Sequence, residues 1–552
     1  MKQFKKRKIS LTLILLLIIG VVGFGLRVYR VGSNPPSLYW DEVSIGYEAY
    51  SVAQTGKDSH GNSWWQPIFP AYGDYKAPVY IWITSLFLKI VPLSNFSVRL
   101  LSVLAGTMMI FLIYLLALEL FDREKKEIGL LAALVMAILP WHLQFSRAAF
   151  EANLGLTFLT LTLYLILLGR RKGWVLPVAA MIGAAAVYSY FSVRFVLPVV
   201  AVSTVIFFTL TFWRQRRFLI SGLFLFGVLL LPLLRSPFYG VSQQLRLSTQ
   251  TIFDENSPVL YANELRLQDD NSFFSRIVHH RYWYWGKLLT VNIGKHLSFD
   301  YMFLSGDSNL RHGIGIVGLM YPLFMPFFLV GWYGLWRMEK RVNLWLLWWW
   351  LIALVPASVP TDGPHALRSL NAVPVFGLVL AVGFVTIFKY VKKRVIYRFG
   401  FSLYILGLLI TIGGYFWYYH RDYPRESYLD WFGDYTAVAR YLLEKRGEYN
   451  RLYAHIGDNL GLYLMFYGKY SPVYFHNLEK QTVREDPFDL RFTSFDKFDV
   501  AISREEMMLS KAPLVLGIVP IGEMTDMLPI VDYFYDSKGA VRYVAFEVTN
   551  HE

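Results

Sequence analysis

The chain contains no cysteine, so disulfide bridges and metal sites built on thiolates are excluded. Charged residues are also scarce: they make up 17% of the 552 residues, whereas 55% are hydrophobic and the mean hydropathy is +0.37. A soluble protein of this length could not bury so much apolar surface, so most of the chain is expected to face lipid or other membrane helices. The net charge of +14 falls in short basic clusters between apolar segments, which argues against nucleic-acid binding.

Acidic residues are absent before Asp41. A basic start, MKQFKKRK, precedes the apolar segment Ile9–Val28, which at about twenty residues is long enough to cross a bilayer. We expect an uncleaved span rather than a signal peptide, because no small-residue cleavage site follows it. The basic start keeps the amino terminus in the cytoplasm, so that Asp41 emerges outside.

Further apolar segments bring the expected number of transmembrane helices to eleven. These segments are 9–28, 97–121, 128–145, 152–169, 174–190, 195–213, 218–234, 314–336, 343–358, 370–388 and 399–419. Five basic turns, around Arg123, Arg170, Arg214, Arg337 and Lys389, all fall on the cytoplasmic side in this scheme. Two long segments, 29–96 and 235–313, are expected outside.

The segment 76–93 is apolar but short, and Lys76 and Lys89 bound it. A span there would reverse the side of every later loop, so we interpret it as an interfacial helix on the outer leaflet. The expected domains are a transmembrane domain, 1–420, and a soluble extracytoplasmic domain, 421–552. The fold class is mainly α: a polytopic membrane protein with a small C-terminal α/β domain.

In the C-terminal domain the pattern predicts helices at 433–446 and 458–467 and strands at 451–455, 498–503 and 514–519. A hairpin is expected to turn at 536–539.

The pair Asp41–Glu42 opens a predicted helix that ends near Gly56. Asp41 is expected to cap this helix, to act as a general base, or to do both. The periodicity places Glu48 and Gln54 on the polar face of the same helix.

Other polar clusters are expected on the same outer face. Lys76, near Asp74, could contact a lipid headgroup or a substrate phosphate, and Arg147 and Glu151 are spaced for an ion pair on one helix. The remaining candidates stand just before two spans: Asp307, Arg311 and His312 before one, and Asp362, His365 and Arg368 before the other.

Several cations and at least two acids on one membrane face suit a reaction in which a phosphate departs while a carboxylate deprotonates a hydroxyl. Nucleotide sugars are not normally available outside the cytoplasm, so an activated sugar there would be lipid-linked. His60, His312 and His365 are far apart in sequence, so no metal cage is obvious and no cofactor is required. A divalent ion on Asp41 and Glu42 stays open.

The stretches WDEVSIGYEAY, GKDSHGNSWWQP, GDYKAPVYIW and FSVRLLSVLAGT resemble the dolichyl-phosphate-mannose-protein mannosyltransferase-like glycosyltransferases (family 39 type), which have the GT-C fold and include the bacterial aminoarabinose transferases. The stretches FSRAAFEANL, GDSNLRHG and DGPHALRS look like the same bacterial group. The resemblance covers roughly residues 10–380 and implies a membrane-bound glycosyltransferase.

By this resemblance the reaction is an inverting transfer from a polyprenyl-phosphate sugar to a protein, lipid or glycan hydroxyl in the plasma membrane. Asp41 would be the base and Glu42 its neighbour in the family's acidic pair. Lys76 would help to hold the donor phosphate, with Arg311 or Arg368, whereas Arg147 and Glu151 would shape the pocket.

The family's Lys-Pro-Pro stretch here reads Lys76-Ala-Pro, and Tyr75 stands where the aminoarabinose branch has an acid. Asp74 could substitute for that acid. The departure argues against transfer of aminoarabinose to lipid A.

The alternatives are a transporter or flippase of lipid-linked sugars and a glycan polymerase or ligase. Transporters tend to carry charges near mid-bilayer, whereas here most ionisable residues stand at the outer ends of spans, which favours an enzyme. The aromatic residues Tyr39, Trp40, Trp64 and Trp65 could stack on a sugar or form an interfacial belt.

Overall fold

The computed structural model describes residues 10–72, 74–208, 212–248, 251–253, 256–361, 363–392, 395–457, 459–477, 481–482, 492–500, 503–524 and 528–549. The chain divides into two compact units. The first comprises Met1–Tyr29, Ser102–Ser146 and Phe150–Phe416, and the second comprises Arg30–Leu101, Arg147–Ala149 and Trp417–Glu552. The expected boundary at residue 420 groups the chain differently, because residues 30–101 belong to the same unit as the C-terminal segment.

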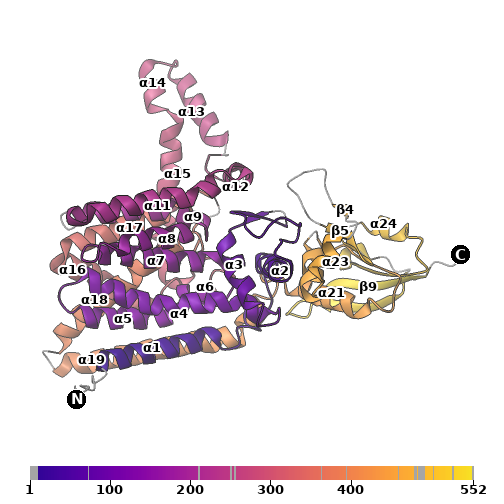
Figure 1. Cartoon of the computed structure of the whole chain (residues 1–552), viewed down its shortest axis with the longest axis horizontal. Helices are drawn as coiled ribbons and strands as arrows, with labels where there is room; N and C mark the ends of the chain where they lie inside the picture. The colour runs from indigo at the N-terminus through magenta and orange to yellow at the C-terminus, as the bar shows by residue number, and fades with distance from the viewer. Residues whose placement is uncertain are drawn as a thin grey trace. The chain divides into compact units, whose positions relative to one another are not determined.

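The first unit is helical, and many of its long helices run roughly alongside one another in Figure 1. Two helices, α4 and α19, continue into the second unit. The helices that coincide with expected spans are α1 (Leu11–Val28), α4 (Asn95–Leu120), α5 (Lys125–Ile138), α6 (Pro140–Ser146), α7 (Glu151–Gly169), α8 (Val175–Val187), α9 (Phe191–Phe207), α11 (Arg216–Leu234), α16 (Met325–Met338), α17 (Lys340–Ser358), α18 (Val373–Val391) and α19 (Val395–Arg421).

All eleven expected spans therefore contain helix, although the span expected from residue 314 begins only at the short helix η3 (Pro322–Phe324). Among the described residues, six helices are long and apolar enough to cross a membrane, or seven if the bent pair α5 and α6 forms one span. The chain is thus an integral membrane protein of mainly helical structure. The number of spans, eleven, stays a prediction, because α8 and α9 are apolar but shorter.

Helices α5 and α6 meet at a bend of 60°. Pro140 starts α6 and cannot donate a backbone hydrogen bond, so α5 ends with free carbonyls. Arg27, which is fully buried, donates to two of them, the carbonyls of Met136 at 2.8 Å and Ala137 at 3.1 Å. A charged side chain thus closes a helix end within the apolar bundle.

The five basic turns gather at one end of the first unit. Two ion pairs join these turns to neighbouring helix ends, Lys389–Glu124 and Arg171–Glu119. In addition, Gln215 packs on Gly173, and Glu339 lies near Asp122. The alternation of basic turns along the sequence predicts this gathering at one membrane face. The assignment of that face to the cytoplasm stays a prediction.

The long segment after α11 is also helical, and α13, α14 and α15 project from the rest of the first unit (Figure 1). Its elements are α12 (Pro237–Ser248), α13 (Asn256–Gln268), α14 (Phe273–Val278), α15 (Arg281–His296) and the π-helical turn η2 (Asp300–Leu304). The remaining short helices of this unit are η1 (Trp213–Gln215) and η4 (Leu370–Ala372).

The second unit contains both helices and strands. Its helices are α2 (Trp40–Thr55), α3 (Pro78–Phe87), α20 (Tyr423–Glu426), α21 (Gly433–Lys445), α22 (Leu460–Tyr467), α23 (Pro472–Asn477), α24 (Arg504–Met508) and η5 (Ile521–Glu523). Its strands are β1 (Phe69–Ala71), β2 (Asp74–Lys76), β3 (Arg451–Ala454), β4 (Gln481–Thr482), β5 (Phe492–Phe495), β6 (Phe498–Val500), β7 (Leu514–Pro520), β8 (Ile530–Tyr535) and β9 (Val541–Thr549).

These elements match the helices and strands expected in the tail, including the hairpin of β8 and β9; residues 501–502 of the strand expected at 498–503 lie outside the described residues. The strand order is β4-β5-β6-β3-β7-β9-β8, and β3 is parallel to both of its neighbours. A buried cluster on this sheet contains Val515, Val519 and Phe546. The tail therefore has the expected α/β character.

Helix α2 packs against α22, which explains why the first long segment joins the C-terminal residues in one unit. The Tyr463 hydroxyl donates to the Leu38 carbonyl at 2.9 Å, and the Tyr47 hydroxyl donates to the Tyr470 carbonyl at 3.2 Å. A methyl group added at Gly46 would lie 2.7 Å from both the Phe466 ring and the Val98 side chain, so a larger residue there would force these side chains to move.

Candidate functional site

With the exception of Glu151, the described candidate residues fall into two groups, one in each unit. In the first group, Lys76 lies between two carboxylates. Its Nζ forms an ion pair with Asp41 and lies 3.0 Å from Asp74 Oδ2. The same ammonium lies 4.6 Å from the centre of the Trp40 ring, a cation–π contact. The structure thus brings together Asp41, Asp74 and Lys76, as expected.

Local structure explains this arrangement. Strands β1 and β2 form an antiparallel hairpin in which Lys76 pairs with Phe69 and Asp74 pairs with Ala71. Asp74 and Lys76 are two residues apart on one strand, so their side chains share a face. Pro78 then starts α3.

The exposure of the three side chains differs. Lys76 is 3% exposed, whereas Asp41 is 37% and Asp74 is 24% exposed. A buried cation is stable only when opposite charges accompany it, and here two acids do so. The more open Asp41 can exchange its partner with an incoming ligand, so this group can bind an anion and receive a proton.

Glu42 differs from its neighbour Asp41. It is 2% exposed, and its carboxylate accepts from Arg99 Nε and Nη2, each at 2.9 Å. It also accepts from the backbone N–H groups of Tyr39 and Ala149 at 3.1 Å and 2.7 Å. With all these partners, the side chain holds the start of α2 in place.

The expectation that Asp41 caps α2 is therefore wrong, because Tyr39 precedes the helix and Glu42 accepts the free N–H. Arg99 is a further residue of this site that the sequence pattern does not single out. This residue donates to the carbonyls of Val31 at 3.0 Å and Pro35 at 2.9 Å as well as to Glu42. The signal was an arginine within the apolar stretch FSVRLLSVLAGT.

Arg147 is 2% exposed and donates to the Asn34 carbonyl at 2.9 Å and the Tyr419 hydroxyl at 3.1 Å. The helix expected to carry both Arg147 and Glu151 is interrupted, because α6 ends at Ser146 and α7 begins at Glu151. The expected one-helix ion pair is therefore wrong. Arg147 stabilises the second unit, and Glu151 is half-buried in the first turn of α7.

Glu48 was expected on a polar face but is 3% exposed. Its carboxylate accepts from the Ser59 backbone N–H at 2.9 Å and from the Ser59 hydroxyl. Burial, and next the charge of Asp58, raise the pKa of Glu48 to about 8. The glycine- and serine-containing stretch GKDSHGNS that supplies these partners was the missed signal.

The aromatic residues of the second unit form an exposed cluster. The rings of Trp65 and Trp82 stack with their centres 5.3 Å apart, and Trp64 packs edge-on against both. Trp64 is 45% and Trp65 is 66% exposed. This surface suits either a sugar or the membrane interface, so both expectations stay open.

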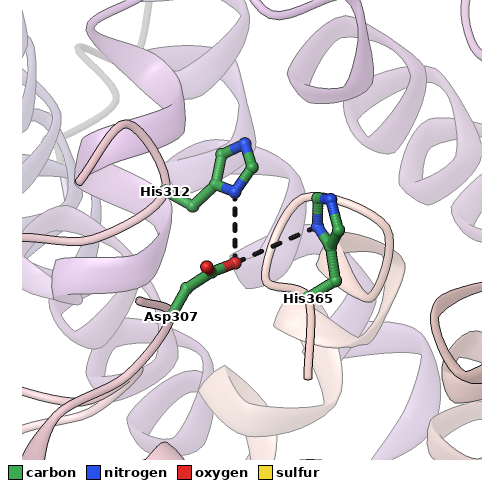
Figure 2. Close-up of side chains that lie close together, drawn as sticks. All are labelled: Asp307, His312 and His365. Atoms are coloured by element: carbon green, nitrogen blue, oxygen red, sulfur yellow. Dashed lines mark hydrogen bonds and ion pairs between the residues drawn. The ribbon is translucent and has the colours of Figure 1, made fainter. Parts of the chain in front are cut away.

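The second group lies in the first unit and centres on Asp307, which Figure 2 shows beside His312 and His365. The Asp307 Oδ2 lies 3.1 Å from His312 Nδ1 and 3.9 Å from His365 Nδ1. The two imidazole rings are 4.7 Å apart. All three side chains are buried or nearly so, with exposures of 5%, 7% and 12%.

Backbone groups fix this cluster. Asp307 accepts from the N–H groups of Asn309 at 2.9 Å and Ala366 at 2.8 Å. The His365 N–H donates to His296 Nε2 at 3.0 Å, and the other ring nitrogen of His296 lies 2.8 Å from the Asn292 carbonyl. His296, which the sequence analysis missed, is therefore neutral with its proton on Nδ1.

The charges in this cluster are unequal. Burial opposes ionisation of Asp307, but the hydrogen bond and charge of His312 outweigh it and lower its pKa to about 2. Burial, and next the charges of His312 and Arg368, lower the pKa of His365 well below its ordinary value. Burial also lowers the pKa of His296. An ionised carboxylate thus faces a neutral imidazole.

The remaining candidates are nearby. Arg311 is half-buried and its Nε donates to Asn309 at 3.2 Å, and Arg368 is half-buried three residues after His365. Asp362 lies outside the described residues. The sequence offers no obvious metal cage, but the ligand atoms of Asp307, His312 and His365 all lie within 4.8 Å of one another. The fold joins residues that are far apart in sequence.

Comparison with known proteins agrees with this architecture. ArnT from Cupriavidus metallidurans bound to undecaprenyl phosphate aligns with a TM-score of 0.52 and 12% identity over 97% of each chain. Its apo structure aligns with a TM-score of 0.50 and 11% identity over the same shares. The archaeal oligosaccharyltransferase AglB from Archaeoglobus fulgidus, in complex with an inhibitory peptide and a dolichol-phosphate, aligns with a TM-score of 0.45 and 14% identity over 82% of this chain. The chain spans 63% of the AglB chain.

The class of protein is therefore an integral membrane protein of the GT-C fold. Within that class, residues 75–239 match the family of dolichyl-phosphate-mannose-protein mannosyltransferases, which agrees with the resemblance found in the sequence. No curated protein matches the chain in a sequence search.

Proposed function

We propose that this protein is a glycosyltransferase that moves a sugar from a polyprenyl-phosphate carrier to an acceptor hydroxyl on the outer face of the plasma membrane. The observation that carries the proposal is the buried Lys76 ammonium held between Asp41 and Asp74. The mannosyltransferase match, which includes Lys76, supports the reaction class. The fold shared with ArnT, whose structure contains undecaprenyl phosphate, supports the choice of carrier.

In the proposed reaction, the donor phosphate takes the place of Asp41 as a partner of Lys76. The acceptor oxygen then attacks the anomeric carbon while the bond from that carbon to the phosphate oxygen breaks, with inversion. Asp41 receives the hydroxyl proton, and Lys76 neutralises the charge on the departing polyprenyl phosphate. Asp74 keeps the ammonium in position.

This proposal gives Glu42 a positioning role rather than a catalytic one, because both of its oxygens are already engaged by Arg99. The roles expected for Arg311 and Arg368 toward the phosphate stay predictions. The sugar and the acceptor are left open.

The test uses the full chain in lipid nanodiscs with a panel of radiolabelled undecaprenyl-phosphate sugars and membrane extracts as acceptor. The wild-type protein is expected to consume one of the donors. The Asp41→Asn variant should consume that donor at a rate that is lower by at least about 100-fold. Asp532→Asn, at an exposed position of β8, is the matched control and should keep the rate. Wild-type turnover in a folded Asp41→Asn variant would overturn the assignment of the base.

The same assay distinguishes the alternatives when it is repeated in sealed vesicles. Movement of intact labelled donor across the bilayer without a new covalent product would indicate a transporter. Growth of a lipid-linked glycan by repeated units would indicate a polymerase, and transfer of a whole glycan would indicate a ligase.

A further inference from the structure

We propose that Asp307, His312 and His365 bind one divalent transition-metal ion of the zinc type. The inference concerns the first unit alone and does not depend on sugar transfer. The three side chains come from two loops, 305–321 and 359–369, that the fold brings together. Figure 2 shows both imidazoles directed toward the same carboxylate.

The distances suit coordination. Bonds of about 2.0–2.2 Å in a tetrahedral site place neighbouring ligand atoms about 3.3 Å apart. The Asp307 oxygen is 3.1 Å from His312 Nδ1 and 3.9 Å from His365 Nδ1. The three ligand atoms all lie within 4.8 Å of one another, so the two histidines must move closer together for both nitrogens and the oxygen to reach one ion.

A second observation points to a ligand independently. The Nδ1 of His365 is buried and has no hydrogen-bond partner, although it faces the Asp307 carboxylate. A buried polar atom without a partner costs free energy. A metal ion would accept the lone pair of this nitrogen and remove that cost.

The surrounding groups resemble the outer layer of a metal site, in which ligands are held by further hydrogen bonds. The backbone N–H of Ala366 donates to the Asp307 oxygen that faces the histidines, and His296 accepts from the backbone N–H of His365. These contacts hold Asp307 and His365 in place through backbone groups.

Asp307 lines two pockets of the first unit. The smaller pocket also contains His312 and Gln144, and the larger one contains Lys295 and Asp300. Three protein ligands leave a coordination position for water or an anionic oxygen.

The ligand set selects the metal. Two imidazoles and one carboxylate favour zinc and similar ions, whereas magnesium and calcium prefer oxygen ligands alone. The site therefore differs from a divalent site on Asp41 and Glu42, which would offer only oxygens.

The test is metal binding to the full chain in nanodiscs after treatment with a chelator. We expect one zinc ion per chain, no displacement by a large excess of magnesium, and at least about tenfold weaker binding in His312→Ala, His365→Ala and Asp307→Asn. His279→Gln is the matched control and should bind zinc normally, because His279 forms a pair with Asp269 at 2.8 Å but is not in the cluster.

X-ray absorption at the zinc edge keeps the proposal falsifiable if a variant fails to fold. The wild-type spectrum is expected to fit two imidazole nitrogens. A spectrum without imidazole, or equal zinc affinity in the folded variants, would overturn the proposal. Since these readouts do not involve sugar transfer, failure here and failure of the proposed activity are distinguishable.

Discussion

Arg99 donates to both carboxylate oxygens of Glu42, at 2.9 Å each, and both side chains are almost completely buried. Glu42→Gln should therefore destabilise the protein, because it leaves the Arg99 charge buried without its partner. The expected loss is about 3 kcal/mol in the free energy of unfolding, measured by equilibrium unfolding in mixed micelles.

The control for this prediction is Glu448→Gln, which removes an ion pair with Lys445 in an exposed part of the same unit. No measurable change is expected there, because water and salt screen exposed pairs. Equal effects of the two substitutions would mean that the buried pair has no special importance.

Lys76→Met should weaken donor binding by about 10- to 100-fold, because the phosphate loses its cation and meets two acids instead. The measurement is the affinity for an undecaprenyl-phosphate sugar as salt concentration is raised, and the salt dependence should also fall in the variant. Lys89→Met is the matched control, since Lys89 is exposed just after α3. If both variants bind alike, Lys76 does not contact the donor.

The relation between sequence and structure is clearest at α2 and the hairpin that follows it. The end of the helix at Gly56 and the closeness of Asp74 to Lys76 depend on neighbouring residues, so the sequence pattern predicts them. The partner of Glu42 could not be predicted, because Arg99 is 57 residues away. The pair forms only when the fold brings distant segments together.

Glu48 shows a different limit. A carboxylate in a helical pattern is normally placed on the exposed face, since burial of a charge is costly. Here the loop residue Ser59 supplies two hydrogen bonds, and the raised pKa of Glu48 keeps the group largely neutral at pH 7. The hydrophobic periodicity of a helix does not indicate whether a loop elsewhere in the chain will supply hydrogen bonds to one of its side chains.

Glu48→Gln should change how stability depends on pH. The pKa of Glu48 is raised from 4.5 to about 8, so between these values the folded protein holds a proton that the unfolded chain has lost. Wild-type stability should therefore fall as pH rises from about 4.5 to about 8, by at most about 5 kcal/mol. The variant, which carries no titrating group there, should lack this fall.

The measurement is the unfolding midpoint of both proteins at about pH 5 and about pH 8. Glutamine can keep both contacts, because its oxygen can accept from the Ser59 N–H and its amide can donate to the Ser59 hydroxyl. The two proteins should differ little at the lower pH, and the variant should be the more stable one at the higher pH. Parallel pH dependence in both would contradict the assignment.

Gly383→Ala should destabilise the first unit, because α18 packs against α16 at this position without room for a side chain. An added methyl group would lie 1.8 Å from the Phe327 carbonyl, and the nearby rings of Phe327 and Phe384 are already stacked at 3.7 Å. Close backbone approach through small residues is a main source of helix packing in membranes. We expect a loss of about 1–3 kcal/mol in the free energy of unfolding and a lower thermal unfolding midpoint.

The control is Gly413→Ala in α19. A methyl group added at Gly413 meets no atom within 4 Å, so this variant should keep the thermal unfolding midpoint unchanged. Equal midpoints for both variants would mean that α16 and α18 can separate at no cost.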